Sequence, residues 1–266
     1  MNEAKVRAEI ISRQEIEKYL PTGEKTPEIL VFDCLDSTNT YAAELFRAGA
    51  EHGTAVIARE QSAGRGRNGN SFFSPRDMGL YMSLILCCNS LGIMPQQTTI
   101  AAAVAARRGI CKVTGVSPSI KWVNDLYYRG RKICGILAEG MTEGEELAGV
   151  VVGIGINCTT AQEMFPPELR EKAGSLGEYS FSTNRLAAEI MKELLSLSEN
   201  SGFSDILEEY RSGSPICGKR ISFMWQGETV TATAEAIDRN GNLVARQDGG
   251  ETITLPGGEV SVLGEF

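Results

Sequence analysis

Glycine and arginine alternate in one short segment, Gly64-Arg65-Gly66-Arg67-Asn68-Gly69. Glycines let backbone N–H groups approach an anion closely, and arginine side chains neutralise its charge. The letters also fit the G-x-G-x-x-G fingerprint of dinucleotide-binding folds, but that fingerprint opens a helix and is followed by an acidic residue about 20 positions later. Here Asn70-Ser71-Phe72-Phe73-Ser74-Pro75 does not begin a helix, and residues 87–93 contain no acid. The segment therefore predicts an anion-binding loop rather than a dinucleotide site.

A second basic segment comprises Lys121-Trp122-Val123-Asn124-Asp125 and, after a short gap, residues 129–139. Lys132 begins an apolar stretch, and Gly135 permits close approach of a ligand or of another backbone. Asp125 either holds a magnesium ion or caps a turn, and residues 129–132 taken alone also fit a solvated hairpin tip. Further on, Gly153-Ile154-Gly155-Ile156-Asn157 predicts a buried strand whose last amide either reads the edge of an adenine or closes a turn.

Hydroxyl and amide side chains stand together in Ser37-Thr38-Asn39, ahead of a predicted helix. The same tripeptide recurs as Ser182-Thr183-Asn184 ahead of another predicted helix, where nothing else suggests a site. The tripeptide alone is therefore mainly a helix-capping signal. Only the position of the first copy, between a predicted strand and the glycine- and arginine-containing loop that begins at Gly64, makes it a candidate binding element.

The charges of the chain are unevenly distributed. The 266 residues carry a net charge of −8, which argues against a protein that coats nucleic acid or an anionic membrane. Residues 59–135 nevertheless hold eleven Lys and Arg against three Asp and Glu, a net of +8, so the rest of the chain carries −16. This basic block predicts a compact anionic ligand such as a nucleotide phosphate or a carboxylate, although a solvated basic face has the same composition.

Several kinds of chemistry are excluded by what the chain lacks. His52 is the only histidine, so no site with two histidine ligands can form, and a Ser-His-Asp triad would have to use a residue in a predicted turn. The seven cysteines are scattered without a C-x-x-C pair, which is typical of reduced thiols in the cytoplasm. With no signal-peptide core and no apolar run near the ~20 residues that span a bilayer, we expect a soluble cytoplasmic protein.

Hydrophobic spacing predicts the elements that must position these residues. Apolar runs predict strands over residues 29–33, 54–59, 80–88, 119–123, 132–139 and 147–157, the last two joined as a hairpin through 142–145. Helical spacing predicts helices around 12–19, 41–46, 98–113, 186–195 and 206–210. After residue 215, five short strands broken by Gly- and Asn-containing turns predict a small closed barrel.

The motifs at 37–39, 61–69, 121–125, 131–137 and 153–157 occur in an order and spacing that resemble the biotin–protein ligases. The resemblance covers roughly residues 29–266. It implies an α+β catalytic domain, a mixed β-sheet with flanking helices related to class II aminoacyl-tRNA synthetases and lipoate ligases, over residues 29–215. An SH3-like β-barrel would occupy 216–266 and a short extension 1–28. Since 1–28 leaves no room for a DNA-binding helix-turn-helix, we expect the monofunctional type, which binds no DNA.

The resemblance also implies a two-step reaction with ATP and biotin as substrates and Mg²⁺ as cofactor. Biotin would be activated to biotinyl-5′-AMP and then transferred to a lysine of a biotin carboxyl carrier protein domain, so neither step needs a nucleophile from the enzyme. Catalytic roles would fall to Lys132, Arg67 and Asp125, with Asp125 also the magnesium ligand. The implied biotin-binding residues are Ser37, Thr38, Asn39, Gln61, Gly64, Arg65, Gly66, Arg67, Lys132 and Gly135. The implied ATP-binding residues are Arg65, Arg67, Lys121, Asn124, Asp125, Lys132 and Asn157.

Three residues depart from the family pattern: Asn70 replaces an arginine, Phe72 a tryptophan and Val123 a proline. We expect a looser grip on phosphate and a less rigid turn, with activity retained through the remaining basic residues.

The rival interpretations are a lipoate–protein ligase, disfavoured by the Gly-Arg-Gly-Arg sequence of the loop, and a biotin- or nucleotide-sensing protein without transfer. The glycine content and the paired arginines of the loop at residues 64–69 predict that this loop folds over the adenylate when ligand binds. The identity of the acceptor and the formation of a homodimer stay open.

Overall fold

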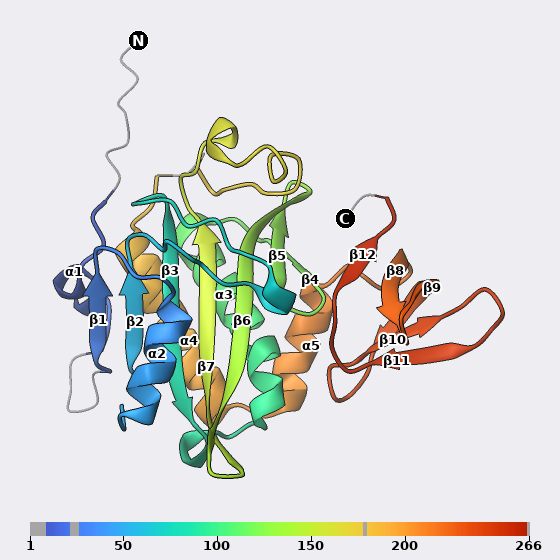
Figure 1. Ribbon diagram of the computed structural model, residues 1–266, viewed down its shortest axis with the longest axis horizontal. Coiled ribbons are helices and arrows are strands. Elements are labelled where there is room, and N and C mark those ends of the chain that lie inside the picture. Colours follow the sequence, from blue (N-terminus) through green and yellow to red (C-terminus); the bar gives the residue numbers. More distant parts are fainter. Residues whose placement is uncertain (1–8, 22–26, 178–179, 265–266) are drawn as a thin grey trace.

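Seven strands of the chain form one mixed β-sheet in the order β1-β2-β3-β7-β6-β5-β4 (Figure 1). The computed structural model describes residues 9–21, 27–177 and 180–264, so part of the predicted N-terminal extension, 1–8 and 22–26, lies outside the described residues. The strands are β1 (Ile29–Phe32), β2 (Ala55–Ala58), β3 (Gly79–Cys87), β4 (Ser119–Lys121), β5 (Asp125–Tyr128), β6 (Arg131–Glu143) and β7 (Glu146–Asn157). Only β1 and β2 pair in parallel; the other neighbours are antiparallel.

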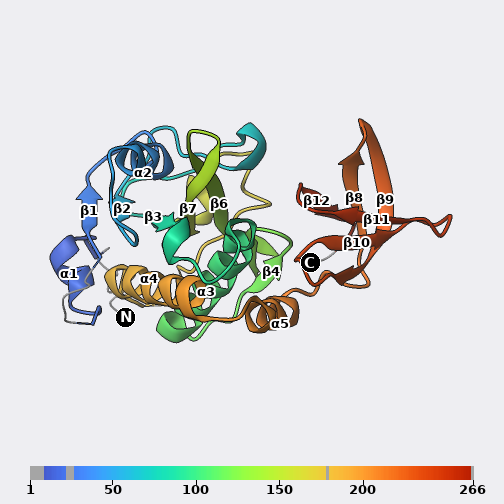
Figure 2. The same cartoon turned by 90° about the horizontal axis from the view of Figure 1, so that it is seen from below.

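Helices cover both faces of this sheet. α2 (Thr38–Arg47) packs on one face against β2, β3 and β7, whereas α3 (Thr98–Thr114) and α4 (Thr183–Asn200) lie on the other (Figure 2). α1 (Arg13–Glu17) contacts β1 and α4, and α5 (Phe203–Gly213) contacts α3 and β4. Cover on both faces explains why β2 and β3 are nearly continuous apolar runs without polar alternation. The predicted α+β architecture is confirmed.

The two faces have separate apolar cores. Beneath α2, Phe46 packs with Val56, Ile85 and Val151 in a small cluster. The opposite face holds the larger core, in which residues 101–106 of α3 are all fully buried. Five of these six residues are alanine, and their small side chains let α3 fit between the sheet and α4. The sheet is thus a rigid platform for residues at its ends and along its exposed positions.

The C-terminal strands form a separate five-stranded antiparallel sheet, to the right in Figure 1. They are β8 (Arg220–Trp225), β9 (Glu228–Ile237), β10 (Leu243–Arg246), β11 (Thr252–Leu255) and β12 (Val260–Val262). All five predicted strands are confirmed. Within the described residues β11 and β12 stand at the two ends of the hydrogen-bonded order, so closure into a barrel stays a prediction.

One strand escaped the sequence analysis. β5 runs from Asp125 to Tyr128, shortly after the predicted strand 119–123, and pairs with both β4 and β6. It is only four residues long and begins with a charged side chain, so neither its length nor its periodicity marks it as a strand. Across the described part of the chain, no helix is long and apolar enough to cross a membrane.

Candidate active site

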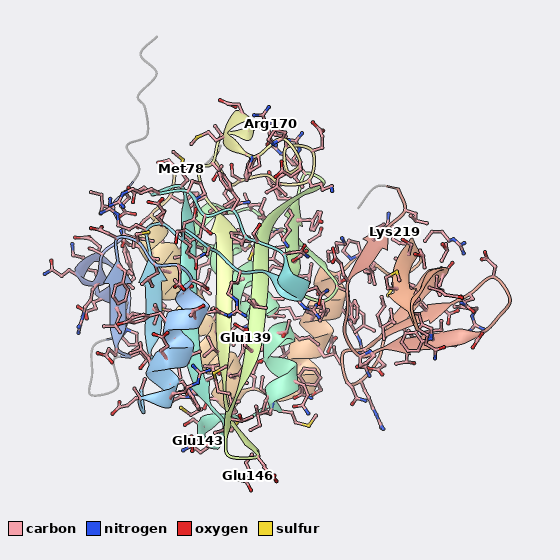
Figure 3. The ribbon with its side chains drawn as sticks, in the orientation of Figure 1. Met78, Glu139, Glu143, Glu146, Arg170 and Lys219 are labelled. Atoms are coloured by element: carbon pink, nitrogen blue, oxygen red, sulfur yellow. The ribbon has the colours of Figure 1, made fainter. Side chains whose placement is uncertain are left out.

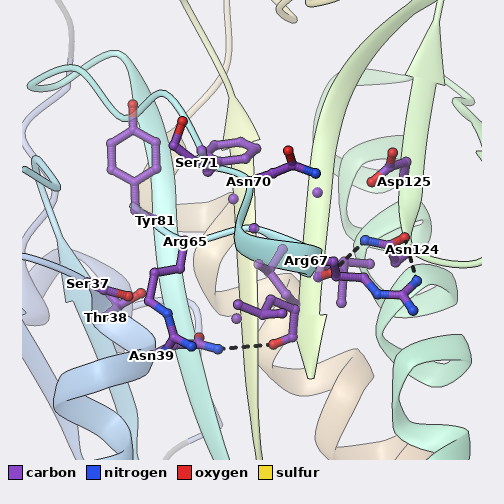
Figure 4. A pocket seen from close by; sticks show the side chains of 18 of the residues that line it. Ser37, Thr38, Asn39, Arg65, Arg67, Asn70, Ser71, Tyr81, Asn124 and Asp125 are labelled. Carbon is purple, nitrogen blue, oxygen red and sulfur yellow. Dashed lines mark hydrogen bonds between the residues drawn. The ribbon is translucent and has the colours of Figure 1, made fainter. Parts of the chain in front are cut away.

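A cavity lies between the start of α2 and the arginine loop, which we define as residues 64–72 (Figure 4). β6 and β7 line it with residues 135–137 and 153–155, and residues 258–259 of the C-terminal domain border it as well. Its empty volume is about 760 Å³, open solvent at the mouth included. The sequence-predicted residues that line it are Ser37, Thr38, Asn39, Gln61, Arg65, Gly66, Arg67, Asn124, Asp125, Lys132 and Gly135. Five motifs that are far apart in the sequence therefore meet in one place.

A wider groove adjoins this cavity and shares Gln61, Asp125 and Lys132 with it. It adds two further predicted residues, Gly64 and Lys121, to the lining. Asn157, by contrast, lines neither space. Its side chain is buried, and its Nδ2 donates to the carbonyl of Gly174 at 2.9 Å. This contact ties the end of β7 to a residue 17 positions later in the chain, and the nucleotide role of Asn157 stays a prediction.

The two Ser-Thr-Asn tripeptides behave differently. Ser182 caps α4, because its hydroxyl accepts a hydrogen bond from the backbone N–H of Arg185. Ser37 occupies the corresponding N-cap position of α2 but makes no side-chain capping bond. Instead, the next residue, Thr38, donates its backbone N–H to Gln61 Oε1 at 2.8 Å. The second copy is a helix cap, as predicted, and the first turns its hydroxyls toward the cavity and its neighbours.

Ser83 is a site residue that the sequence analysis missed. It is fully buried in the middle of β3, where its Oγ lies 2.7 Å from Thr38 Oγ1 and 2.6 Å from Asn39 Oδ1. Asn39 Nδ2 in turn donates to the carbonyl of Leu137 at 3.1 Å and to Glu139 Oε2 at 2.9 Å. Ser83 is the only serine or threonine in β3, and a hydroxyl inside an apolar strand was the signal that could have revealed it.

The arginine loop folds back on itself as a narrow hairpin. Gly66 N–H donates to the carbonyl of Asn70 at 2.7 Å, and Phe72 N–H donates to the carbonyl of Gly64 at 2.8 Å. Asn68 at its tip has a φ of 55°, a left-handed conformation that asparagine tolerates better than most residues. A Cβ at Gly64 would overlap the carbonyl of Phe72. Glycine at position 64 is therefore required by close approach of the loop's own backbone, whereas the predicted approach of an anion to these glycines stays a prediction.

The two arginines of the loop differ in electrostatic environment. Arg65 donates from both terminal nitrogens to Glu139, at 2.6 and 3.1 Å, and so its charge is neutralised by a carboxylate. Glu139 lies midway along β6 (Figure 3). Arg67 donates to two neutral oxygens, Asn124 Oδ1 and the carbonyl of Gly258, both at 3.2 Å (Figure 4). Within the described chain Arg67 has no ion-pair partner, so its charge is available to an anionic ligand.

Lys132 and Asp125 form an ion pair on neighbouring strands, with Lys132 Nζ 2.7 Å from Asp125 Oδ1. Both residues line the cavity and the groove. Lys121 lies at the groove with its ammonium 5.4 Å from the centroid of the Tyr127 ring, and burial lowers the pKa of this ammonium. Burial, helped by the charge of Asp125, raises the pKa of the Tyr127 phenol to about 12. Lys121 and Lys132 therefore both line the groove, where a polyanionic ligand could meet their ammonium groups.

The donor set for a metal ion is sparse. Among the described residues no group of three or more His, Cys, Asp or Glu side chains could hold a cation. Asp125 and Glu259 both line the cavity, and each can offer carboxylate oxygens. This fits Mg²⁺, which is commonly bound by one or two carboxylates together with substrate phosphates and water. It does not fit a cage built from protein ligands alone.

An aromatic ring lies over glycines of the two central strands. Gly135 and Gly155 are register partners on β6 and β7, and a Cβ at Gly155 would lie 2.6 Å from the Phe72 ring. Phe72 also packs edge-to-face with Tyr81, their centroids 6.4 Å apart. At Gly135 the neighbours are the Phe72 ring and the end of the Lys132 side chain, not another backbone, so the predicted approach of a ligand there stays a prediction. The Phe72 and Tyr81 rings give the cavity one apolar wall.

The C-terminal domain contributes to this site from outside the main sheet. Gly258 accepts a hydrogen bond from Arg67, and Glu259 lines both the cavity and the groove. Trp122 Nε1, in the 121–125 motif, donates to the carbonyl of Gly241 at 2.9 Å. No residue of this domain was predicted to belong to the site, because Gly258 and Glu259 stand in an ordinary turn sequence without any chemical pattern.

Comparison with known proteins identifies two family regions. Residues 31–157 match the biotin/lipoate A/B protein ligase family, and residues 216–263 match the biotin protein ligase C-terminal domain. The bifunctional ligase/repressor BirA of Bacillus subtilis is 38% identical over 168 residues, which are 63% of this chain and 52% of that protein. The chain thus spans about half the length of the Bacillus relatives it matches.

Two further comparisons cover most of the chain. The biotin protein ligase from Aquifex aeolicus in complex with biotin and ATP has the same fold, with a TM-score of 0.75 at 22% identity over 90% of this chain and 99% of that one. The bifunctional ligase/repressor BirA of Escherichia coli is 30% identical over 247 residues, 88% of this chain and 74% of that protein. Extending through both domains, this likeness shows that the chain belongs to the biotin protein ligase family.

Proposed function

We propose that this chain activates biotin with ATP to biotinyl-5′-AMP and transfers the biotin to a lysine of a biotin carboxyl carrier protein domain. The observation that carries the proposal is the composition of one cavity. A cluster of hydroxyl and amide side chains around Thr38 suits a neutral polar ring, and the free charge of Arg67 and the Lys132 ammonium suit a carboxylate and a phosphate. A ligand with a polar ring, an apolar chain and a carboxylate end would use all of these features, with Phe72 against the apolar part.

The proposed roles follow the two parts of the site. Ser37, Thr38, Asn39, Gln61, Gly64, Gly66 and Gly135 form the surroundings of the biotin ring and chain. Arg67 and Lys132 hold the biotin carboxylate against the reacting phosphate, while Lys121 and Asn124 face the ATP side. Arg65, which is neutralised by Glu139, contributes mainly by anchoring the loop. For Asn157 the nucleotide role rests on the sequence pattern alone, since its amide is engaged by Gly174.

The chemistry requires no nucleophile from the protein. In the first step a carboxylate oxygen of biotin forms a bond to the α-phosphorus of ATP, and pyrophosphate leaves. In the second step the lysine amine of the carrier attacks the acyl carbon and AMP leaves. The enzyme orients the reactants and stabilises the charge on phosphate through Arg67 and Lys132. Mg²⁺, held by Asp125 and the phosphates, would neutralise part of the charge of pyrophosphate.

The only histidine stays outside this chemistry. His52 Nδ1 accepts a hydrogen bond from the backbone N–H of Cys87 at 3.0 Å, and its Nε2 lies 3.0 Å from Glu199 on α4. Both nitrogens are engaged between the end of β3 and α4, away from the cavity lining. General acid–base catalysis by imidazole is therefore not part of the proposed mechanism.

Exchange of labelled pyrophosphate into ATP tests the first step. We expect exchange that depends on biotin and is not supported by lipoate. Preferential exchange with lipoate would favour the lipoate–protein ligase alternative, and binding of biotin without any exchange would favour a sensor. Transfer is then tested by mass spectrometry of a carrier domain incubated with the protein, ATP and biotin, where we expect the mass of one biotinyl group on one lysine.

A further inference from the structure

A chain of buried polar contacts runs from β6 through α2 to β3. It begins at Glu139, passes through the Asn39 amide and Ser83 Oγ, and ends at Thr38 Oγ1. Asn39 and Thr38 are 3% and 4% exposed, and Ser83 is fully buried. Because these side chains are almost entirely buried, their protein partners within 3.1 Å are the main acceptors for their hydrogen atoms.

Glu139 and Leu137 fix the orientation of the Asn39 amide, the first side chain after Glu139 in this series of contacts. Both present acceptors to Asn39, a carboxylate oxygen at 2.9 Å and a backbone carbonyl at 3.1 Å. The amide of Asn39 must therefore point its NH₂ group at them, and both N–H donors are used. Its oxygen then faces Ser83 Oγ at 2.6 Å, a distance that requires a hydrogen between the two oxygens. Since an amide oxygen carries none, the single Ser83 hydrogen must be donated to Asn39.

The remaining hydrogen is that of Thr38. Its Oγ1 lies 2.7 Å from Ser83 Oγ and 3.1 Å from Gln61 Oε1. Ser83 has already used its hydrogen, so the shorter contact needs the hydrogen of Thr38. The 3.1 Å contact between Thr38 Oγ1 and Gln61 Oε1 can lack a hydrogen, because Gln61 Oε1 also accepts the backbone N–H of Thr38 at 2.8 Å. Thr38 is then left with a lone pair, and no hydrogen, for a ligand in the cavity.

We propose that Ser83, oriented by Asn39 and Glu139, is a positioning residue that makes Thr38 a hydrogen-bond acceptor toward the ligand. The site would thereby select a ring N–H at this position and reject a ring oxygen. The inference rests on the proposed function, since biotin carries a ureido ring with two N–H groups. Ser37 fits the same scheme, because it lines the cavity and its hydroxyl has no hydrogen-bond partner among the described residues, which leaves it free to donate to the ureido carbonyl.

The test compares biotin with the two cyclic carbamates in which one or the other ureido N–H is replaced by oxygen. Dissociation constants are measured by calorimetry for the unmodified protein and for Ser83→Ala. The unmodified protein should bind one carbamate about 10- to 30-fold more weakly than biotin because two lone pairs would face each other at Thr38. In Ser83→Ala the Thr38 hydrogen is released, and the carbamate oxygen can then compete for it with Gln61 Oε1, 3.1 Å away. That ratio should therefore fall to about threefold or less, even if both ligands bind more weakly.

Two further variants separate positioning from a general loss of structure. In a Thr38→Val background the ratio should already be small, and Ser83→Ala should not change it further, as expected for residues that act through one contact. Ser198→Ala is the matched control: Ser198 is also fully buried and its Oγ donates to Leu195, but it lies in α4 outside the cavity lining. It should lower the melting temperature without altering the ratio.

The outcomes are distinguishable. An unchanged biotin-to-carbamate ratio in a folded Ser83→Ala variant overturns the inference and leaves the proposed function standing. An effect of Ser83→Ala on the ratio that persists in the Thr38→Val background also overturns it, because Ser83 would then act by another route. Failure of the unmodified protein to bind biotin at all overturns both the inference and the proposed function.

Discussion

Replacing Lys132 by alanine tests how much of the first step depends on one ammonium group. Lys132 Nζ lies 2.7 Å from Asp125, and the side chain is a third exposed, so the site is partly shielded from water. At an effective dielectric constant of about 20, unit charges 4 Å apart interact by about 4 kcal/mol. Exposure reduces this to roughly 3–4 kcal/mol for a phosphate placed beside Lys132, which corresponds to a loss of about 10²–10³-fold in rate.

The assay is biotin-dependent pyrophosphate exchange at saturating ATP. Lys132→Ala also leaves the Asp125 carboxylate without its cation, so part of the measured loss comes from repulsion between that carboxylate and phosphate. Lys112→Ala is the matched control: Lys112 Nζ lies 2.7 Å from Glu189 in an ion pair between α3 and α4, away from the cavity. Exchange by Lys132→Ala within about threefold of the unmodified rate would refute the role assigned to this ammonium.

Three other perturbations have defined outcomes. Ser182→Ala should lower the free energy of unfolding by about 1 kcal/mol, the value of a helix cap, without changing biotin affinity in calorimetry; a collapse of affinity would mean that the wrong Ser-Thr-Asn was assigned. Gly153→Ala should increase the KM for biotin by a much larger factor than the KM for ATP, because the added Cβ overlaps Asn39 Oδ1. Equal fold increases in the two KM values would contradict this. The hydrogen bonds from Arg59 lower the pKa of the Asp77 carboxyl, so their stabilisation is complete above the ordinary value of 3.8 and is lost as the pH falls below it. Acid unfolding should therefore become less steep in Asp77→Asn, and identical acid transitions would argue against the pair.

The motifs were predictable from the sequence because each combines residue types that are informative at short range. Glycine next to arginine marks a loop that binds anions, and Lys132 followed by Gly135 marks a close approach on a strand. Their convergence on one cavity also followed from the family resemblance. Ser83 and Glu139 could not be recognised in the same way. Their role depends on which side chains of α2 and of the arginine loop pack against that face of the sheet, and that is a property of tertiary packing rather than of neighbouring letters.

The choice between alternative roles for one residue was likewise beyond the sequence. Arg65 and Arg67 are two positions apart with glycine between them, and nothing in the letters distinguishes them. In the folded chain Arg65 meets a carboxylate on β6, whereas Arg67 meets a neutral amide and a backbone carbonyl. Arg67 can therefore bind an anionic substrate directly, whereas Arg65 must first release Glu139.

The same reasoning applies to the basic block as a whole. Counted along the sequence, residues 59–135 carry +8, but much of this charge is paired in the fold with acids from the same block or from the acidic remainder of the chain. Arg59 pairs with Asp77 and Asp33, and Arg108 pairs with Glu193 and Glu209 far from the cavity. Arg67, Lys121 and Lys132 are left facing the cavity and its groove, and among the described residues Asp125 is the only carboxylate bonded to one of them. The positive field is therefore concentrated where the substrate phosphates are proposed to bind, because acidic residues remote in sequence neutralise it elsewhere.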